Sequence, residues 1–255
     1  YDDDIVDQFL AMSTHDDLLL FTNKGKVYRL RGFHVPASAR TSKGVPVVNL
    51  LALDDGEEVK TLVKVKRDDE ESKYAFFVTK YGIVKRVEVS EFDSIRQNGK
   101  IAITLREDDE LVAVRMTNGD NEIIIGGSNG KAVRFEEDQV RVMGRSAAGV
   151  QGFNVDGGEV VGVATDKEGQ YILAITEKGY GKRTELSEYR ITKRGAKGVK
   201  TVNITEKNGN LVALRAVNGD EEALIISNDG TVIRIAVKDV GIYGRSTIGV
   251  RMISV

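Results

Sequence analysis

One arginine recurs at a fixed place five times in this sequence. It stands four residues after a turn glycine, at Arg29, Arg86, Arg134, Arg183 and Arg234. A second arginine stands four residues before a later glycine, at Arg40, Arg145, Arg194 and Arg245, and Arg96 takes this place in a shortened copy. A guanidinium can bind a phosphate through two parallel hydrogen bonds. It can equally lay its stem on a sheet and hold loop carbonyls, and for the first set of arginines both roles stay open.

The glycines that flank these arginines define a repeat. The turn glycines are separated by 57, 48, 49 and 51 residues and stand at Gly25, Gly82, Gly130, Gly179 and Gly230. A closing glycine follows each of them by 17 or 19 residues, at Gly44, Gly99, Gly149, Gly198 and Gly249. Two landmarks with one period indicate internal repetition. The same repetition brings the phrase GRSAAGV of residues 144–150 back as GRSTIGV at residues 244–250.

Every repeat contains the pattern of a β-hairpin. Two runs of β-branched and apolar residues flank a polar turn that ends in glycine, as in LLLFTNKGKVYRL, AFFVTKYGIVKRV, IIIGGSNGKAVRF, ILAITEKGYGKRT and LIISNDGTVIRI. Another apolar segment precedes each hairpin and one more follows each closing glycine, so we expect four short strands per repeat. Convincing helical periodicity is absent, and the repeat length is typical of a propeller-like blade. The sequence predicts one all-β domain over residues 1–255, with repeats at approximately 3–54, 55–107, 108–156, 157–206 and 207–255.

Charge is separated within the repeat, although the net charge is only -2. The segments 25–47, 82–102, 130–152, 179–201 and 230–252 together hold 24 basic and 9 acidic residues. The rest of the chain holds 13 basic and 30 acidic residues. Equivalent placement in every blade predicts a basic surface suited to a long polyanion such as duplex DNA. The alternative is that these side chains only solvate loops and pair with nearby acids.

The loop lysines that vary between copies are the strongest candidates for contacting DNA: Lys43, Lys100, Lys193, Lys197 and Lys200. The predicted DNA-binding set also includes the arginines named above, together with Arg31, Lys85 and Lys182. Short loops carry these residues, and no helix is expected that could enter the major groove. Binding should therefore follow charge and DNA bendability and not base sequence.

Catalytic chemistry has little support in the sequence. Cysteine is absent, and the two histidines, His15 and His34, stand in no metal or nucleophile motif. The acidic run EDDE at residues 107–110 lacks calcium-loop spacing, and GYGKR at residues 179–183 lacks the phosphate-loop pattern. We predict no catalytic residues, metal or cofactor. The N-terminus has no signal-peptide pattern and no apolar run of membrane-spanning length exists, so a cytoplasmic, non-membrane protein is expected.

Several long phrases carry a family resemblance. The run THDDLLLFTNKGKVYRLRGFHVPASARTSKGVPVVNLLAL, the phrases IRQNGKIAI and AITEKGYGKRTELSEYR, and KRGAKGVKT resemble the C-terminal domains of DNA gyrase A subunits, from about Asp3 to Val255. The resemblance implies a β-pinwheel whose neighbouring blades exchange strands. It also implies that the domain bends DNA around a basic perimeter, which lets the holoenzyme introduce negative supercoils using ATP. The partners implied are duplex DNA, the gyrase B subunit, and the N-terminal domain of the gyrase A subunit. The isolated domain is expected to be monomeric and not itself an enzyme.

The chain departs from the family pattern in two ways. Family members usually have six blades and a box of the form QRRGGKG, whereas this chain has five repeats, and its nearest match is KRGAKG at residues 193–198. A blade carrying the box is expected upstream of Tyr1. Two alternatives remain: the related domain of topoisomerase IV, with fewer blades and a degenerate box, and a protein-interaction propeller that does not bind DNA.

Overall fold

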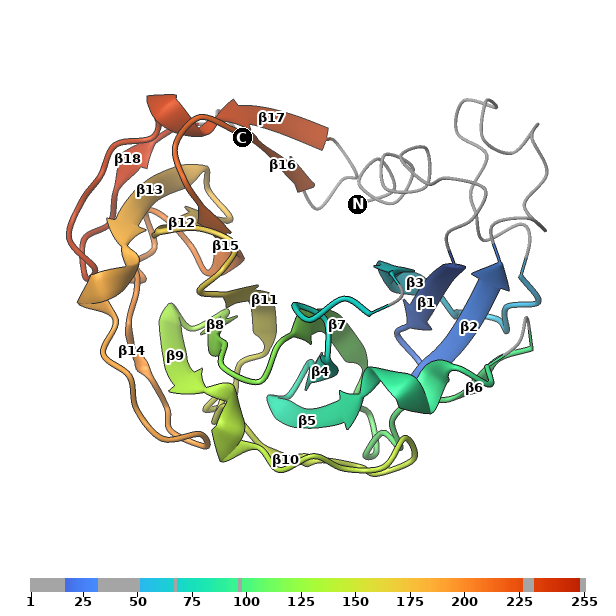
Figure 1. Ribbon diagram of the computed structural model, residues 1–255. Coiled ribbons are helices and arrows are strands. Elements are labelled where there is room, and N and C mark those ends of the chain that lie inside the picture. The colour runs from blue at the N-terminus through green and yellow to red at the C-terminus, as the bar shows by residue number, and fades with distance from the viewer. Residues whose placement is uncertain (1–16, 32–50, 67, 96–97, 227–231, 253–255) are drawn as a thin grey trace. The chain divides into compact units, whose positions relative to one another are not determined.

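The computed structural model describes residues 17–31, 51–66, 68–95, 98–226 and 232–252. These residues form short β-strands and four 3-10 helices, and no α-helix is found among them (Figure 1). The five predicted hairpins are β1 (Asp17–Thr22) with β2 (Lys26–Arg31), β4 (Tyr74–Thr79) with β5 (Ile83–Glu88), β8 (Glu122–Gly127) with β9 (Lys131–Glu136), β12 (Tyr171–Thr176) with β13 (Tyr180–Glu185), and β16 (Glu222–Ile226) with β17 (Val232–Ala236). The all-β prediction is confirmed.

Turn glycines close these hairpins because the backbone there takes a left-handed conformation. The φ angles are +78° at Gly25, +88° at Gly82, +82° at Gly130 and +86° at Gly179. At Gly82 space is also limiting, since a Cβ atom would lie 2.0 Å from the carbonyl oxygen of Phe153. Only glycine meets both requirements without strain.

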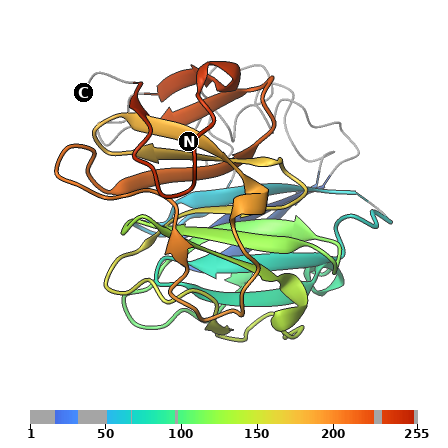
Figure 2. The ribbon, with the colours of Figure 1, turned by 90° about the vertical axis from the view of Figure 1, so that its left-hand side faces the viewer.

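Longer strands follow four of the hairpins and pair back onto them. They are β3 (Val59–Val65), β7 (Leu111–Thr117), β11 (Val160–Thr165) and β15 (Leu211–Val217). A two-residue strand lies on the other side of each of these four hairpins: β6 (Lys100–Ile101), β10 (Val150–Gln151), β14 (Val199–Lys200) and β18 (Val250–Arg251). The sheet orders are β3-β1-β2-β6, β10-β5-β4-β7, β11-β8-β9-β14 and β15-β12-β13-β18, with β16-β17 as a fifth, two-stranded sheet among the described residues. In Figure 2 the yellow to orange strands β12, β13 and β15 lie side by side.

Each four-stranded sheet takes strands from two successive sequence repeats. In the first sheet, β3 precedes the second hairpin in sequence but pairs with β1, from Asp17↔Val65 to Thr22↔Val59. The short strand β6 follows the second hairpin and pairs with β2 through Lys26↔Ile101 and Val27↔Lys100. Neighbouring repeats therefore exchange strands, as the family resemblance implied.

The chain divides into two compact units, and the division runs through β4 and β5. The first unit comprises Tyr1–Phe77, Lys85–Asn118 and Val142–Gly149, and the second comprises Val78–Val84, Gly119–Arg141 and Val150–Val255. Among the described residues no helix has the length and hydropathy of a membrane span.

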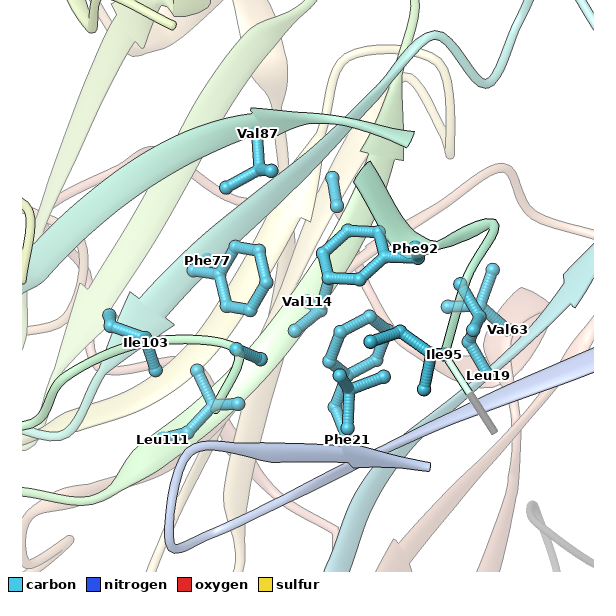
Figure 3. Packing of buried hydrophobic residues seen from close by; sticks show 13 residues of the cluster. Leu19, Phe21, Val63, Phe77, Val87, Phe92, Ile95, Ile103, Leu111 and Val114 are labelled. Atoms are coloured by element: carbon cyan, nitrogen blue, oxygen red, sulfur yellow. The ribbon is translucent and has the colours of Figure 1, made fainter. Parts of the chain in front are cut away.

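An aromatic cluster forms the centre of the first unit (Figure 3). The ring of Phe21 meets the rings of Phe77 and Phe92 edge to face, with centroids 5.4 and 5.5 Å apart. Phe92 belongs to the 3-10 helix η3 (Val89–Phe92), which follows β5. The start of the loop after this hairpin is therefore fixed by the core, because edge-to-face pairs favour one ring arrangement.

Candidate nucleic-acid interface

Four loops and the short strands that follow them contain most of the described candidate residues that are open to solvent. We call the four loops the closing loops: residues 89–99, 137–149, 186–198 and 237–249. Each starts in a 3-10 helix, namely η3, η4 (Glu137–Gln139), η5 (Leu186–Glu188) or η6 (Val237–Asp239), and ends at a closing glycine. One buried side chain at the same distance from the turn glycine anchors each loop: Phe92, Val140, Tyr189 and Val240. Burial of this side chain holds the entry of each loop against its sheet.

A backbone hydrogen bond fixes the middle of three closing loops. The amides of Met143, Thr192 and Tyr243 each donate to the carbonyl oxygen of a strand arginine over 2.8 Å. The acceptors are Arg86, Arg134 and Arg183, respectively. Each of the three loops thus follows the edge of the hairpin that belongs to the preceding repeat.

The second set of arginines connects consecutive loops. Nη1 of Arg194 donates to the carbonyl oxygen of Gln151 over 3.0 Å. In the same way, Arg145 donates to Ile101 and Arg245 donates to Lys200, each over 2.5 Å. All three acceptors lie in the short strand that follows the preceding loop, two residues after its closing glycine. Nε of Arg194 also donates to the carbonyl oxygen of Gln139 over 3.1 Å. One or two of the five guanidinium donors are used in this way, so these arginines combine a structural role with remaining capacity for a phosphate.

The arginines of β2 and β9 are bound by carboxylates. Nη2 of Arg29 lies 2.6 Å from Oδ2 of Asp17, and its Nη1 donates to the carbonyl oxygen of Phe92 over 2.9 Å. Arg134 repeats this arrangement with Glu122 at 2.6 Å and the carbonyl oxygen of Tyr189 at 2.6 Å. Both guanidinium groups join a strand to the turn that begins a closing loop, which supports the structural role.

The arginines of β5 and β13 stack on tyrosines instead. The guanidinium carbon of Arg86 lies 4.7 Å from the ring centroid of Tyr74, and that of Arg183 lies 5.1 Å from the centroid of Tyr171. Nε of Arg183 also donates to the carbonyl oxygen of Val240 over 2.8 Å. Both arginines are only 8% exposed, so their packing also supports the structural role, and contact with DNA stays a prediction.

Two lysines are fully buried beneath closing loops. Nζ of Lys85 donates to the carbonyl oxygens of Gly144 (3.2 Å), Arg145 (2.5 Å) and Ala147 (3.0 Å). Nζ of Lys182 repeats the pattern with the carbonyls of Gly244 and Arg245, at 2.8 and 2.5 Å. This anchoring gives a physical reason for the repeated phrases GRSAAGV and GRSTIGV, because both are loops wrapped over a lysine.

Burial changes the ionisation of these two lysines. Desolvation, with the nearby Arg145 charge, lowers the pKa of Lys85 to about 7. Desolvation likewise lowers the pKa of Lys182 to about 8, although the neighbouring Glu188 opposes the shift. A phosphate could reach either ammonium only by displacing the loop carbonyls that it holds.

The remaining candidates differ in accessibility. Arg31, Lys100, Lys193, Arg194, Lys197, Lys200 and Arg234 are exposed, and Arg145 and Arg245 are half-buried. Lys197 lies 3.7 Å from Asp156, and Arg234 lies 3.3 Å from Glu222; both are exposed ion pairs of the kind that contribute little to stability. Arg40, Lys43 and Arg96 lie outside the described residues, as do His15, His34 and the turn glycine Gly230.

Three exposed arginines of the basic segments were missed as individual candidates, namely Arg141, Arg190 and Arg251. Each lies in a basic segment, so the segment charge already contained the signal, but none occupies a position shared by all repeats. Within the described part of the chain no cluster of three or more acidic or histidine residues could hold a metal ion.

Comparison with known proteins identifies the family. The model of the DNA gyrase C-terminal domain, a β-propeller, matches residues 16–66, 73–118, 121–165, 170–218 and 221–255. The chain is 49% identical over 255 residues to the DNA gyrase A protein of Ureaplasma parvum serovar 3, covering 100% of this chain and 30% of the relative. It is 48% identical over 255 residues to the DNA gyrase A protein of Staphylococcus aureus, covering 99% of this chain and 29% of the relative. The chain thus spans under a third of the length of these relatives.

Two solved structures share the arrangement of sheets. The C-terminal domain of DNA topoisomerase IV matches with a TM-score of 0.85 and 27% identity, covering 95% of this chain and 76% of that one. A DNA gyrase A C-terminal domain matches with a TM-score of 0.79 and 28% identity, covering 96% of this chain and 80% of that one. With five matched repeats, strands exchanged between neighbouring sheets and these relatives, the chain belongs to the DNA gyrase C-terminal domain family and has its β-pinwheel fold.

Proposed function

We propose that this chain binds and bends duplex DNA, as the DNA-wrapping domain of a gyrase A protein. The observation that carries the proposal is the recurrence of closing loops that place basic side chains in solvent and are connected by Arg145, Arg194 and Arg245. A duplex presents a phosphate charge at every step along its backbone, so a series of equivalent loops suits it better than one concentrated site.

The loop after β13 is proposed as the main contact. It carries Lys193, Arg194 and Lys197, and the strand that follows it carries Lys200. All four side chains are exposed. Ion pairs with phosphates would release condensed counterions, which provides affinity without base recognition. Recognition of bases requires an element that enters a groove, and these loops offer short irregular segments instead.

In the intact protein we propose a supporting role for this domain. The similar gyrase A proteins are more than three times as long as the matched segment, so the catalytic groups are proposed to lie elsewhere. The proposed partners are the gyrase B subunit together with the N-terminal part of the gyrase A protein, and the proposed location is the bacterial cytoplasm. DNA bent by this domain would guide ATP-dependent negative supercoiling by the holoenzyme.

A topoisomerase IV role is the second candidate. The similarity to the topoisomerase IV domain, with a TM-score of 0.85, favours it. The identities of 48–49% to gyrase A proteins along essentially the whole chain favour the gyrase role more strongly.

The test is a titration of the 255-residue chain with duplex DNA at several salt concentrations, followed by relaxation of closed circles in its presence. We expect log K to fall linearly with log salt, by about 0.9 per neutralised phosphate, and a shift in the topoisomer distribution. Unrelated duplexes of equal length should compete similarly. Binding that is absent or insensitive to salt would overturn the proposal and favour a protein-interaction role.

A further inference from the structure

Three closing loops expose an aliphatic side chain at the same position. Val142, Ile191 and Ile242 each stand seven residues before a closing glycine and are 41%, 47% and 49% exposed. A single exposed apolar residue is ordinary. An exposed β-branched residue at one position of three loops is a feature of the repeat. The loop at residues 89–99 is shorter and has Ser94 at the same distance from its turn glycine.

The backbone holds these side chains firmly in place. Val142 and Ile242 form isolated parallel bridges with Arg86 and Arg183 of the neighbouring strands. In all three loops, the next residue donates its amide to the carbonyl of the strand arginine over 2.8 Å. The aliphatic groups are therefore presented from a fixed backbone, which reduces the entropy cost when a partner binds.

Their surroundings identify the chemistry of the partner. The exposed Arg141 and Arg190 directly precede Val142 and Ile191, and Arg245 follows Ile242 by three residues. A protein interface needs a contiguous patch with an apolar centre. One aliphatic side chain in each of three loops, beside cations, matches a duplex instead, because apolar deoxyribose faces alternate there with phosphates.

We infer that Val142, Ile191 and Ile242 contact the deoxyribose faces lining the minor groove of the wrapped duplex, while neighbouring basic groups contact its phosphates. This inference rests on the proposed function and adds a non-ionic contact to it. Apolar side chains at the minor groove ease bending in other architectural proteins, since they compensate for partial unstacking. Each of these three closing loops would then contribute both a charge contact and an apolar contact.

The test compares the unchanged chain with the triple variant V142T/I191T/I242T, in which β-branching is kept while apolar surface is reduced. We expect affinity for a duplex of random sequence to fall roughly tenfold, because the apolar area buried against DNA decreases at three sites. The slope of log K against log salt should stay unchanged, because no cation is removed. The topoisomer shift should shrink.

The matched control is V212T/V232T, which alters two exposed valines in strands β15 and β17, outside the closing loops. Its affinity should equal that of the unchanged chain. The inference would be overturned by a triple variant that binds as tightly as the control, or by one whose salt slope falls along with its affinity. The salt slope of the unchanged chain separately tests the proposed function, so the two failures are distinguishable.

Discussion

Nζ of Lys85 lies 2.5 Å from the carbonyl oxygen of Arg145, which is 60 residues further along the chain. Lys182 stands in the same relation to the carbonyl of Arg245, 63 residues further on. Each lysine donates from beneath a loop whose own arginine extends to the strand that follows the preceding loop. These two layers of contact hold two of the four closing loops that we propose as the DNA-binding surface, 137–149 and 237–249.

Replacing Lys85 with methionine should destabilise the fold. The substitution leaves the loop carbonyls at residues 144, 145 and 147 without their common donor, and an unsatisfied buried polar group costs about 1–3 kcal/mol. Urea denaturation should show a loss of this order in the unfolding free energy. Lys100→Met, at an exposed position, should stay within about 0.5 kcal/mol of the unchanged chain. Equal losses in both variants would show that Lys85 does not anchor the loop.

The buried lysines should make stability depend on pH in the alkaline range. Their pKa values, about 7 and about 8 when folded, lie below the ordinary value of 10.5, so at pH 9 the unfolded chain holds protons that the folded chain has released. Stability rises with pH wherever the unfolded state binds more protons. The unfolding free energy should therefore increase from pH 7 to pH 9, by at most about 1.4 kcal/mol per pH unit for each lysine.

Urea denaturation at several pH values checks this expectation. Lys85→Met and Lys182→Met should each remove their share of the increase, even if both variants are less stable at every pH. The unfolding free energy of the unchanged chain could instead decrease from pH 7 to pH 9, by as much as in the variants. That result would contradict the downward direction assigned to the two lysine pKa shifts.

Two glycines with nearly equal φ angles allow a controlled test of packing at a hairpin turn. Gly82 (+88°) would place a Cβ against the carbonyl of Phe153, whereas Gly157 (+83°) has open space around that position. Alanine at either site costs about 1–2 kcal/mol for the left-handed backbone. Gly82→Ala should cost about 1–3 kcal/mol more, because its neighbours must move. Similar thermal midpoints for the two variants would show that the close approach does not limit the turn.

The strand arginines should separate stability from DNA binding. Arg134→Gln removes the ion pair with Glu122 and the hydrogen bonds to two loop carbonyls, so the unfolding free energy should fall by about 2–4 kcal/mol. Under conditions where the variant is folded, its salt slope for DNA should match that of the unchanged chain. A slope lower by about 1 would instead mean that Arg134 neutralises a phosphate.

The sequence predicted the repeat because turn glycines and alternating apolar residues are local signals. Which strands share a sheet was not predictable from them: β3 precedes the second hairpin and yet pairs with β1, a partner determined by packing across repeats. The resemblance alone suggested this exchange.

The candidate site was predictable in part. The segment charges indicated the loops that carry exposed Lys193, Lys197 and Lys200. They could not distinguish these lysines from Lys85 and Lys182, because burial beneath a loop depends on contacts about 60 residues away along the chain. Likewise, the presence of an arginine at this place in every repeat did not show whether Arg29 pairs with a carboxylate, as it does with Asp17, or contacts a phosphate.

The salt dependence of DNA binding tests the central claim most directly. The variant K193Q/K197Q/K200Q removes three exposed charges from one closing loop and its following strand, and K66Q/K73Q/K167Q removes three charges outside the basic segments. The account predicts that the slope of log K against log salt decreases by about 2–3 in the first variant and by less than about 1 in the second. Equal decreases in the two variants would contradict it, since net charge, and not the closing loop, would then govern binding.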